Sequence, residues 1–251
     1  MHDPKIKKKT RFSSGKVSLE RALSKLGLLS RAQTREAVLA GRLAVNGRVV
    51  RDPSFPVAPE TVRFSLDGKL LQRKTWQTIM MNKPKGVVTA RVDKDGERTV
   101  FDLLPEEFRD LHPVGRLDKA TTGLLFLTND TKLSNYLTDP ANAIPRVYAV
   151  TVEGKITDEN IRKAQGGVTD KGELLKASKV TARKISGRES HLIVELSEGK
   201  NRELRRLFDS LGHPVRKIKR ISFGPLVLGD LEPGAYRAVT AQELGWTPKK
   251  N

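Results

Sequence analysis

Asp118 is the residue whose setting most favours chemistry. It lies in Gly115-Arg116-Leu117-Asp118-Lys119-Ala120-Thr121-Thr122-Gly123, between two glycines. Glycine lets the backbone turn tightly or lets a ligand come close, which suits a carboxylate that is presented rather than hidden. Such a carboxylate can attack or stabilise an electron-poor carbon. The alternative interpretation is an ordinary turn aspartate.

The flanking segments predict that this acid has a fixed platform. Val114 and the run Leu124 to Leu127 are typical of buried strands, and Asn129-Asp130 is a turn signal. Asp118 is therefore expected on the connection between two core strands.

Other kinds of chemistry find little support. The chain has no cysteine, which excludes disulfides and thiolate metal sites, and it has neither a Walker sequence nor G-x-G-x-x-G. No cofactor and no metal are expected. The histidines are scattered without metal-ligand spacing: His2, His112, His191 and His213.

The net charge of +18 in 251 residues is the strongest global signal. Lysine and arginine that neutralise phosphates release condensed counterions, so nucleic acid is the leading partner. A membrane surface is the alternative for any basic protein, but no apolar stretch approaches the roughly 20 residues that span a bilayer. Without a secretory apolar region near Met1, we expect a cytoplasmic protein.

The first third of the chain predicts a basic arm and a small domain. Residues 1–16 are lysine-rich and are expected to be disordered, either adding unspecific nucleic-acid affinity or only solubility. An amphipathic helix is expected from Val17 to near Gly27, and a second from its N-cap Ser30 to Gly41. Asn46-Gly47 between short apolar runs predicts a hairpin with a type I′ turn.

A second domain is expected from residue 78, after a linker at 72–77 and before a tail at 247–251. Ile79-Met80-Met81 opens it as a buried strand. Later strand runs alternate with helical segments, which indicates an α+β core, although alternation alone also fits a parallel sheet. Strands are expected at 148–152, 168 and 192–196, and helices at 131–137, 158–164 and 201–211.

Three segments resemble the pseudouridine synthases that modify ribosomal RNA, in the branch with an N-terminal S4-like domain (the RsuA-type family). The first is G-R-L-D followed by T-T-G-L-L-F-L-T-N-D at 115–130. The others are P-R-V-Y-A-V at 145–150 and E-G-K-N-R-E-L-R-R-L-F at 198–208. The resemblance runs from about Val17 to Trp246. It implies an S4-like RNA-binding domain at 17–71 and, at 78–246, a synthase core with a bent, mostly antiparallel mixed sheet flanked by helices.

The resemblance also implies roles for individual residues. Asp118 is the expected essential carboxylate, Tyr148 the tyrosine that stacks on the target base, and Arg205 the first candidate for its cationic partner. Each has a plainer alternative, such as a core tyrosine for Tyr148. The further expected RNA contacts are Arg116, which would help open the RNA, Arg202, Arg146, Lys83, Leu196 in the base pocket, and Arg31, Arg35 and Arg48 in the S4-like domain.

The reaction explains why one acid is enough. Pseudouridine formation breaks the bond from uracil N1 to ribose C1′ and joins C1′ to C5 of the same base. The ribose carbon becomes electron-poor as the base leaves, so a nearby carboxylate is the natural nucleophile or stabiliser. Departing uracil spreads negative charge over its own ring, so no second acid is required. Whether Asp118 attacks C1′ or promotes loss of the C2′ proton stays open.

The third segment favours large-subunit rRNA as substrate, because Gly199-Lys200-Asn201-Arg202-Glu203 resembles members that act on 23S rRNA, in particular the B-type enzyme. We therefore expect an rRNA pseudouridine synthase that works without a cofactor. It is expected to isomerise one specific uridine and to be a monomer. The alternatives are a small-subunit (16S) rRNA pseudouridine synthase and a non-catalytic rRNA-binding or ribosome-assembly protein. DNA binding has little support, since nothing resembles a helix-turn-helix reader.

Overall fold

The computed structural model describes residues 15–59, 61–72, 76–92 and 95–246. The chain divides into two compact units, residues 1–75 and 76–251, each with its own core. The expected tail and most of the expected basic arm lie outside the described residues, as do positions 73–75 of the expected linker. No helix in the described part of the chain is both long and apolar enough to cross a membrane.

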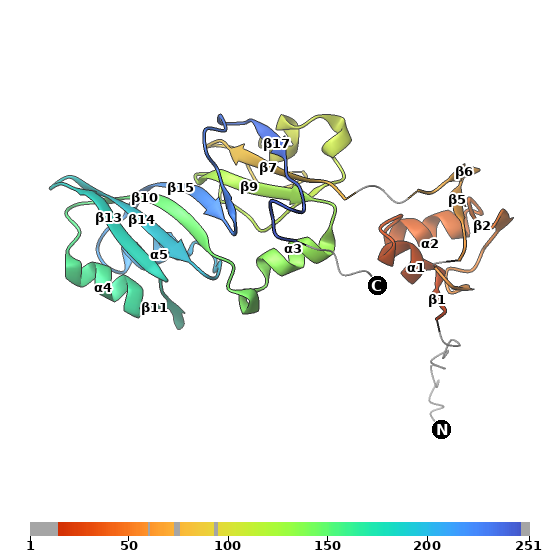
Figure 1. Ribbon diagram of the computed structural model, residues 1–251, viewed down its shortest axis with the longest axis horizontal. Helices are drawn as coiled ribbons and strands as arrows, with labels where there is room; N and C mark the ends of the chain where they lie inside the picture. The colour runs from red at the N-terminus through yellow and green to blue at the C-terminus, as the bar shows by residue number, and fades with distance from the viewer. Residues whose placement is uncertain (1–14, 60, 73–75, 93–94, 247–251) are drawn as a thin grey trace, which may run out of the picture. The chain divides into compact units, whose positions relative to one another are not determined.

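Unit 1 consists of two short helices packed on small sheets (Figure 1). The side chain of Ser30 accepts from the backbone of Gln33, whose side chain accepts from Ser30, so the predicted N-cap is a complete capping box. The predicted hairpin is also confirmed, because Asn46 and Gly47 both have positive φ, 49° and 80°. The helices are α1 (Leu19–Lys25) and α2 (Arg31–Leu39). The strands are β1 (Val17–Ser18), β2 (Leu43–Val45), β3 (Arg48–Val49), β4 (Pro56–Val57), β5 (Phe64–Leu66) and β6 (Lys69–Leu70).

Unit 2 is built on a mixed sheet that has nine strands in the described part of the chain, in the order β13-β14-β10-β15-β9-β7-β17, with β16 on β15 and β8 on β9. All pairings are antiparallel except β9 with β15. The expected α+β fold with a mostly antiparallel sheet is confirmed. The longer strands are β7 (Thr78–Lys83), β9 (Thr122–Thr128), β10 (Arg146–Glu153), β13 (Lys179–Ile185), β14 (Glu189–Leu196) and β15 (Val215–Phe223). The shorter ones are β8 (His112–Pro113), β16 (Leu226–Val227), β17 (Tyr236–Ala238) and a separate hairpin of β11 (Val168–Asp170) and β12 (Glu173–Leu175).

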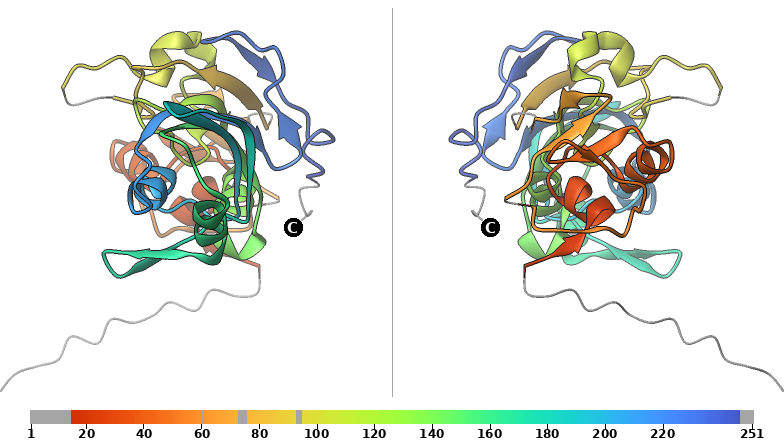
Figure 2. Two further views of the ribbon diagram at one scale, coloured as in Figure 1. Left: turned by 90° about the vertical axis from the view of Figure 1, so that its left-hand side faces the viewer. Right: turned by 90° about the vertical axis from the view of Figure 1, so that its right-hand side faces the viewer.

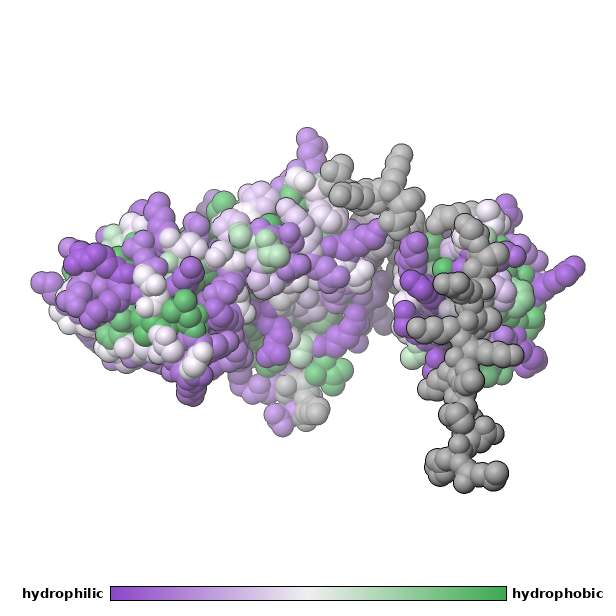
Figure 3. All heavy atoms as spheres, turned by 90° about the horizontal axis from the view of Figure 1, so that it is seen from below, coloured by the Kyte–Doolittle hydropathy of each residue, from purple (hydrophilic) through white to green (hydrophobic). Residues whose placement is uncertain are grey.

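The helices of unit 2 cover the two halves of this sheet differently. Helices α4 and α5 bury one face of β10, β14 and β15, and in Figure 2 the sheet curves over them. Around β7 and β9, separate apolar clusters form on both faces. The helical elements are α3 (Thr131–Thr138), α4 (Asp158–Gly166), α5 (Glu203–Asp209), η1 (Val100–Leu103), η2 (Glu106–Phe108) and η3 (Pro140–Asn142). Hydrophilic side chains cover most of the unit's face in view in Figure 3.

The two halves of the sheet join where β9 runs parallel to β15. The pairing is short, with Lys219 opposite Thr122 and Arg220 opposite Gly123. Gly123 has φ of 103°, and a Cβ atom there would lie 2.2 Å from the carbonyl oxygen of Arg220. Only glycine permits this approach of two backbones. The junction directly follows the loop that carries Asp118.

Candidate active site

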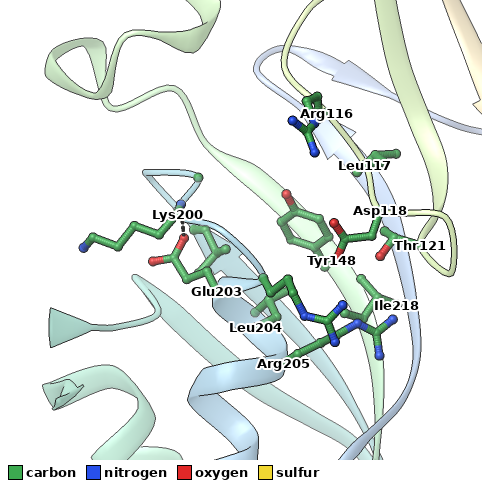
Figure 4. A pocket seen from close by; sticks show the side chains of 13 residues that line it. Arg116, Leu117, Asp118, Thr121, Tyr148, Lys200, Glu203, Leu204, Arg205 and Ile218 are labelled. Atoms are coloured by element: carbon green, nitrogen blue, oxygen red, sulfur yellow. Dashed lines mark hydrogen bonds between the residues drawn. The ribbon is translucent and has the colours of Figure 1, made fainter. Parts of the chain in front are cut away.

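The predicted catalytic residues lie around one pocket of unit 2. Asp118, Tyr148 and Arg205 come from the loop after β8, from β10 and from α5, and all three line this pocket of about 100 Å³. Figure 4 shows the Asp118 carboxylate and the Tyr148 ring on one side of it and the Arg205 side chain below. Arg116, Arg202 and Leu196, which are also predicted site residues, belong to the same lining. Segments more than 80 residues apart in the sequence therefore meet here.

Hydrogen bonds to its neighbours fix the loop of Asp118. Leu117 accepts at its carbonyl from the Thr89 hydroxyl at 2.8 Å, and the carbonyl of Lys119 accepts from the Gly86 backbone at 2.9 Å. Asp118 itself is half-buried, and its own carbonyl closes a turn with the Thr121 backbone. The carboxylate is thus presented from a rigid turn, as the glycines around it predicted.

Lys83 supports this loop from below. Its side chain is fully buried at the end of β7, and its ammonium donates to the carbonyls of Thr121 at 2.9 Å and Pro84 at 3.2 Å, with a longer contact to Lys119 at 3.5 Å. Burial lowers the pKa of Lys83 to about 8, and attraction to the Asp118 carboxylate opposes that change. Lys83 therefore places a cation behind Asp118, whereas the resemblance implied a direct contact with RNA.

Tyr148 and Leu196 form the apolar wall. Tyr148 is 8% exposed and lies in β10 opposite Val194 of β14, and Leu196 is 2% exposed at the end of β14. Both belong to the core cluster under α5, so their side chains emerge from that cluster at the pocket. A flat ring on such a wall can stack on a planar base.

The start of α5 supplies the arginines. The predicted helix at 201–211 is shorter in the structure, because Arg202 adopts a left-handed conformation with φ of 49° and the helix begins at Glu203. Arg205 donates to the carbonyl of Val215 at 3.3 Å, which ties its guanidinium to β15. Among the ion pairs of the described residues none includes Asp118, so Arg202 and Arg205 share its pocket without a direct bridge.

Glu203 is a pocket residue that no sequence pattern predicted. It is 3% exposed, its Oε2 accepts from the Lys200 backbone at 3.0 Å, and its Oε1 is buried without a hydrogen-bond partner. Burial raises the pKa of Glu203 to about 7, and the neighbouring Glu198 carboxylate adds to this. An acid inside a run of four cations, Lys200, Arg202, Arg205 and Arg206, gave no sequence signal of burial.

Arg146 is directed into the protein rather than to a phosphate, contrary to our expectation. Its side chain is 6% exposed, and it donates to the carbonyls of Leu137 at 2.9 Å, Ile144 at 3.2 Å and Ser197 at 3.3 Å. The guanidinium also lies 4.9 Å from the ring centre of Phe223. Through these contacts Arg146 joins β10 to the end of α3.

The expected contacts of the S4-like domain lie on its surface. Arg31, Arg35 and Arg48 are all exposed, the first two on α2 and the third on β3. Arg35 forms an ion pair with Glu20 at 3.0 Å. Within the described residues, no cluster of three or more histidine or acidic side chains could hold a metal ion.

Comparison with known proteins identifies the family to which this chain belongs. The sequence model of RNA pseudouridylate synthases matches residues 77–210, and that of the S4 domain matches residues 18–62. The chain belongs to the RNA pseudouridine synthase family, in its RsuA-type branch with an N-terminal S4 domain, and is an enzyme of that class.

Individual relatives extend the likeness over most of the chain. An uncharacterized RNA pseudouridine synthase of Aquifex aeolicus is 34% identical over 91% of this chain and 92% of its own length. The ribosomal large subunit pseudouridine synthase B of Bacillus subtilis is 31% identical over 90% of this chain and 93% of its own. A crystal structure of a pseudouridylate synthase matches with a TM-score of 0.63 and 27% identity, over 91% of this chain and 98% of that one.

Proposed function

We propose that this protein isomerises a specific uridine of large-subunit rRNA to pseudouridine, with Asp118 as the essential carboxylate. The observation that carries this proposal is that Asp118, Tyr148 and Arg205 line one pocket although they come from three separate segments. The large-subunit substrate is supported by the motif around Asn201 and by the likeness to the Bacillus subtilis enzyme named for that subunit.

In this mechanism Asp118 acts while ionised, either attacking C1′ or promoting loss of the C2′ proton. Both routes break the bond between N1 and C1′ and leave the uracil with the bonding electrons. The surrounding cations, Lys83 behind the loop and Arg202 and Arg205 in the same pocket lining, place positive charge around this carboxylate. They also stabilise negative charge that develops on the departing base.

The other pocket residues hold the base during its rotation. The Tyr148 ring and Leu196 provide an apolar surface against which uracil can turn until C5 faces C1′. Arg116 is exposed at the rim, where its side chain can occupy the space that the uridine leaves in the RNA. The exposed arginines of the S4 domain would bind the same rRNA through its phosphates. We further propose that the enzyme acts in the cytoplasm, as a monomer and without a cofactor.

Mapping of pseudouridines in rRNA tests the proposal. Total rRNA from cells with and without this protein is treated so that pseudouridine blocks reverse transcription, and the two maps are compared. We expect one site to disappear from large-subunit rRNA and to return when the wild-type gene is restored, but not with Asp118→Asn. Loss of a small-subunit site would refute the substrate assignment, and identical maps would refute the catalytic role in rRNA.

A further inference from the structure

A second cavity, on the opposite face of the sheet from α4 and α5, has a strongly basic lining. Its volume is about 530 Å³, and strands β10, β14 and β15 supply most of its floor. We call it the basic groove and define it by its charged and ionisable lining residues, Lys85, Arg183, His191, Arg216, Lys217 and Lys219.

The strand pattern shows why this face is open. In β14 the residues alternate, so that Leu192 and Val194 enter the core under α5 while His191 and Ile193 point to the other side. Ala149 of β10 and Ile193 of β14 belong to none of the four apolar clusters that the described residues form. This half of the sheet therefore has one covered face and one face available to a ligand.

The charge of the groove is unbalanced. Its lining includes five lysines and arginines but no aspartate or glutamate. Arg216 pairs with Glu153 at 3.2 Å and His191 with Glu189 at 3.1 Å. In the described part of the chain Lys85, Arg183, Lys217 and Lys219 form no ion pair. Four unpaired cations around one hollow fit a ligand with several negative charges.

The groove begins at the loop that carries Asp118. Ala120 and Thr122 line the groove, whereas Thr121 between them lines the catalytic pocket with Asp118. Ile218 of β15 contributes to both. A chain that places one unit in the catalytic pocket can therefore continue over this loop into the groove.

The lining also indicates how such a chain would be held. The floor between the cations is aliphatic, from residues such as Ala149 and Ile193, and no phenylalanine, tyrosine or tryptophan lines the groove. Binding by base stacking needs aromatic platforms, whereas lysines and arginines bind phosphates without regard to sequence. The groove is therefore suited to a sugar-phosphate backbone.

We propose that the basic groove binds the backbone of the RNA segment that adjoins the uridine in the Asp118 pocket. This inference rests on the proposed function, because it takes the uridine in that pocket as its starting point. The groove adds affinity and fixes the direction in which the RNA leaves the pocket, while the catalytic residues select and convert the base.

The first test removes two of the unpaired cations with Arg183→Gln and Lys217→Gln in the full-length protein. The matched control is Arg162→Gln with Lys176→Gln, which removes two exposed cations from α4 and from the loop after β12. Binding to an unmodified large-subunit rRNA transcript is measured from 50 to 200 mM KCl, and conversion by the wild-type protein is measured with the same transcript.

Each lost phosphate contact to a single strand lowers the slope of log affinity against log salt by about 0.7. The groove variant, which lacks two such contacts, is therefore expected to have a slope that is shallower by about 1.4. Between 50 and 200 mM KCl the loss of its affinity should be about sevenfold smaller than the loss for the wild type. The control is expected to keep the wild-type slope. A groove variant that behaves like the control would overturn the inference. If the wild type does not convert the uridine in this transcript, the proposed function is contradicted. The binding measurements would still show whether the groove contacts RNA.

The second test maps the position of the RNA. Because the chain has no cysteine, Lys217→Cys creates a unique attachment site for an iron chelate that cleaves nearby RNA. We expect cleavage within a few nucleotides of the converted uridine, and no such cleavage from Lys176→Cys. Cleavage only at distant positions, or equal cleavage from both variants, would show that the groove does not hold the adjoining segment.

Discussion

Glu203→Gln is expected to stabilise the protein in a pH-dependent way. The substitution keeps the shape of the side chain, so the amide oxygen can still accept from the Lys200 backbone, as Glu203 Oε2 does at 3.0 Å. It removes a carboxyl group that is 3% exposed and has one oxygen without a hydrogen-bond partner. A buried carboxylate that has no ion-pair partner lowers the stability of the folded state when it is charged.

The magnitude follows from the raised pKa of Glu203, which burial moves from 4.5 to about 7. At 1.36 kcal/mol per unit, this shift corresponds to about 3 kcal/mol. The folded state binds the proton more tightly than the unfolded state, so the cost is absent below pH 4.5, grows as the pH rises to about 7 and is then constant. Between pH 5 and pH 8 the advantage of the glutamine variant should grow by about 2.5 kcal/mol.

Urea unfolding at pH 5 and pH 8, followed by tryptophan fluorescence, measures this difference. Both tryptophans, Trp76 and Trp246, lie in unit 2, so the signal reports on the unit that includes Glu203. Glu232→Gln, which removes an exposed carboxylate, is the control and should follow the wild type at both pH values. Equal stability differences for Glu203→Gln at pH 5 and pH 8 would refute the inference that burial raises the pKa of this carboxyl.

Three other substitutions test residues that position or line the site. Lys83→Met removes the donor to the buried Thr121 carbonyl and to the part-buried Pro84 carbonyl, and should destabilise unit 2 by about 2–4 kcal/mol and slow conversion; unfolding midpoints and rates at the wild-type level would contradict this. Gly123→Ala forces a Cβ against the Arg220 carbonyl and should cost more than about 3 kcal/mol in urea unfolding, whereas Gly47→Ala, in open space, should cost about 1. Tyr148→Phe should slow single-turnover conversion about 100-fold with RNA affinity unchanged, if the hydroxyl moves a proton; a loss below tenfold would limit Tyr148 to stacking.

Local sequence patterns predicted the elements whose signals are local. The capping box at Ser30 and the Asn46-Gly47 turn depend on neighbouring residues only, and both are present as predicted. The strand that carries Leu124 to Leu127 is apolar throughout because it is covered on both faces. The position of Asp118 between two strands followed from the glycines and apolar runs around it.

The sequence did not predict β15, although this strand joins the two halves of the sheet. Its charged residues include Lys217 and Lys219, and register shifts against β10 break the alternation that marks an exposed strand. Lys83 and Arg146 were expected to contact RNA because their segments resemble motifs of the family, which give no indication of burial. Their burial includes hydrogen bonds to carbonyls of distant segments, Thr121 for Lys83 and Ser197 for Arg146, and no local pattern reveals those partners.

The reaction of Asp118→Asn with rRNA tests the central claim most directly. The amide keeps the size of the side chain but can neither attack C1′ nor accept a proton from C2′. Large-subunit rRNA labelled with tritium at uracil C5 releases tritium on conversion, and RNA affinity is measured on the same preparations. We predict that the wild type releases tritium from one uridine per rRNA, and that Asp118→Asn releases none while binding with nearly the same affinity. Tritium release by Asp118→Asn at a rate near that of the wild type would contradict the assignment of Asp118 as the essential carboxylate.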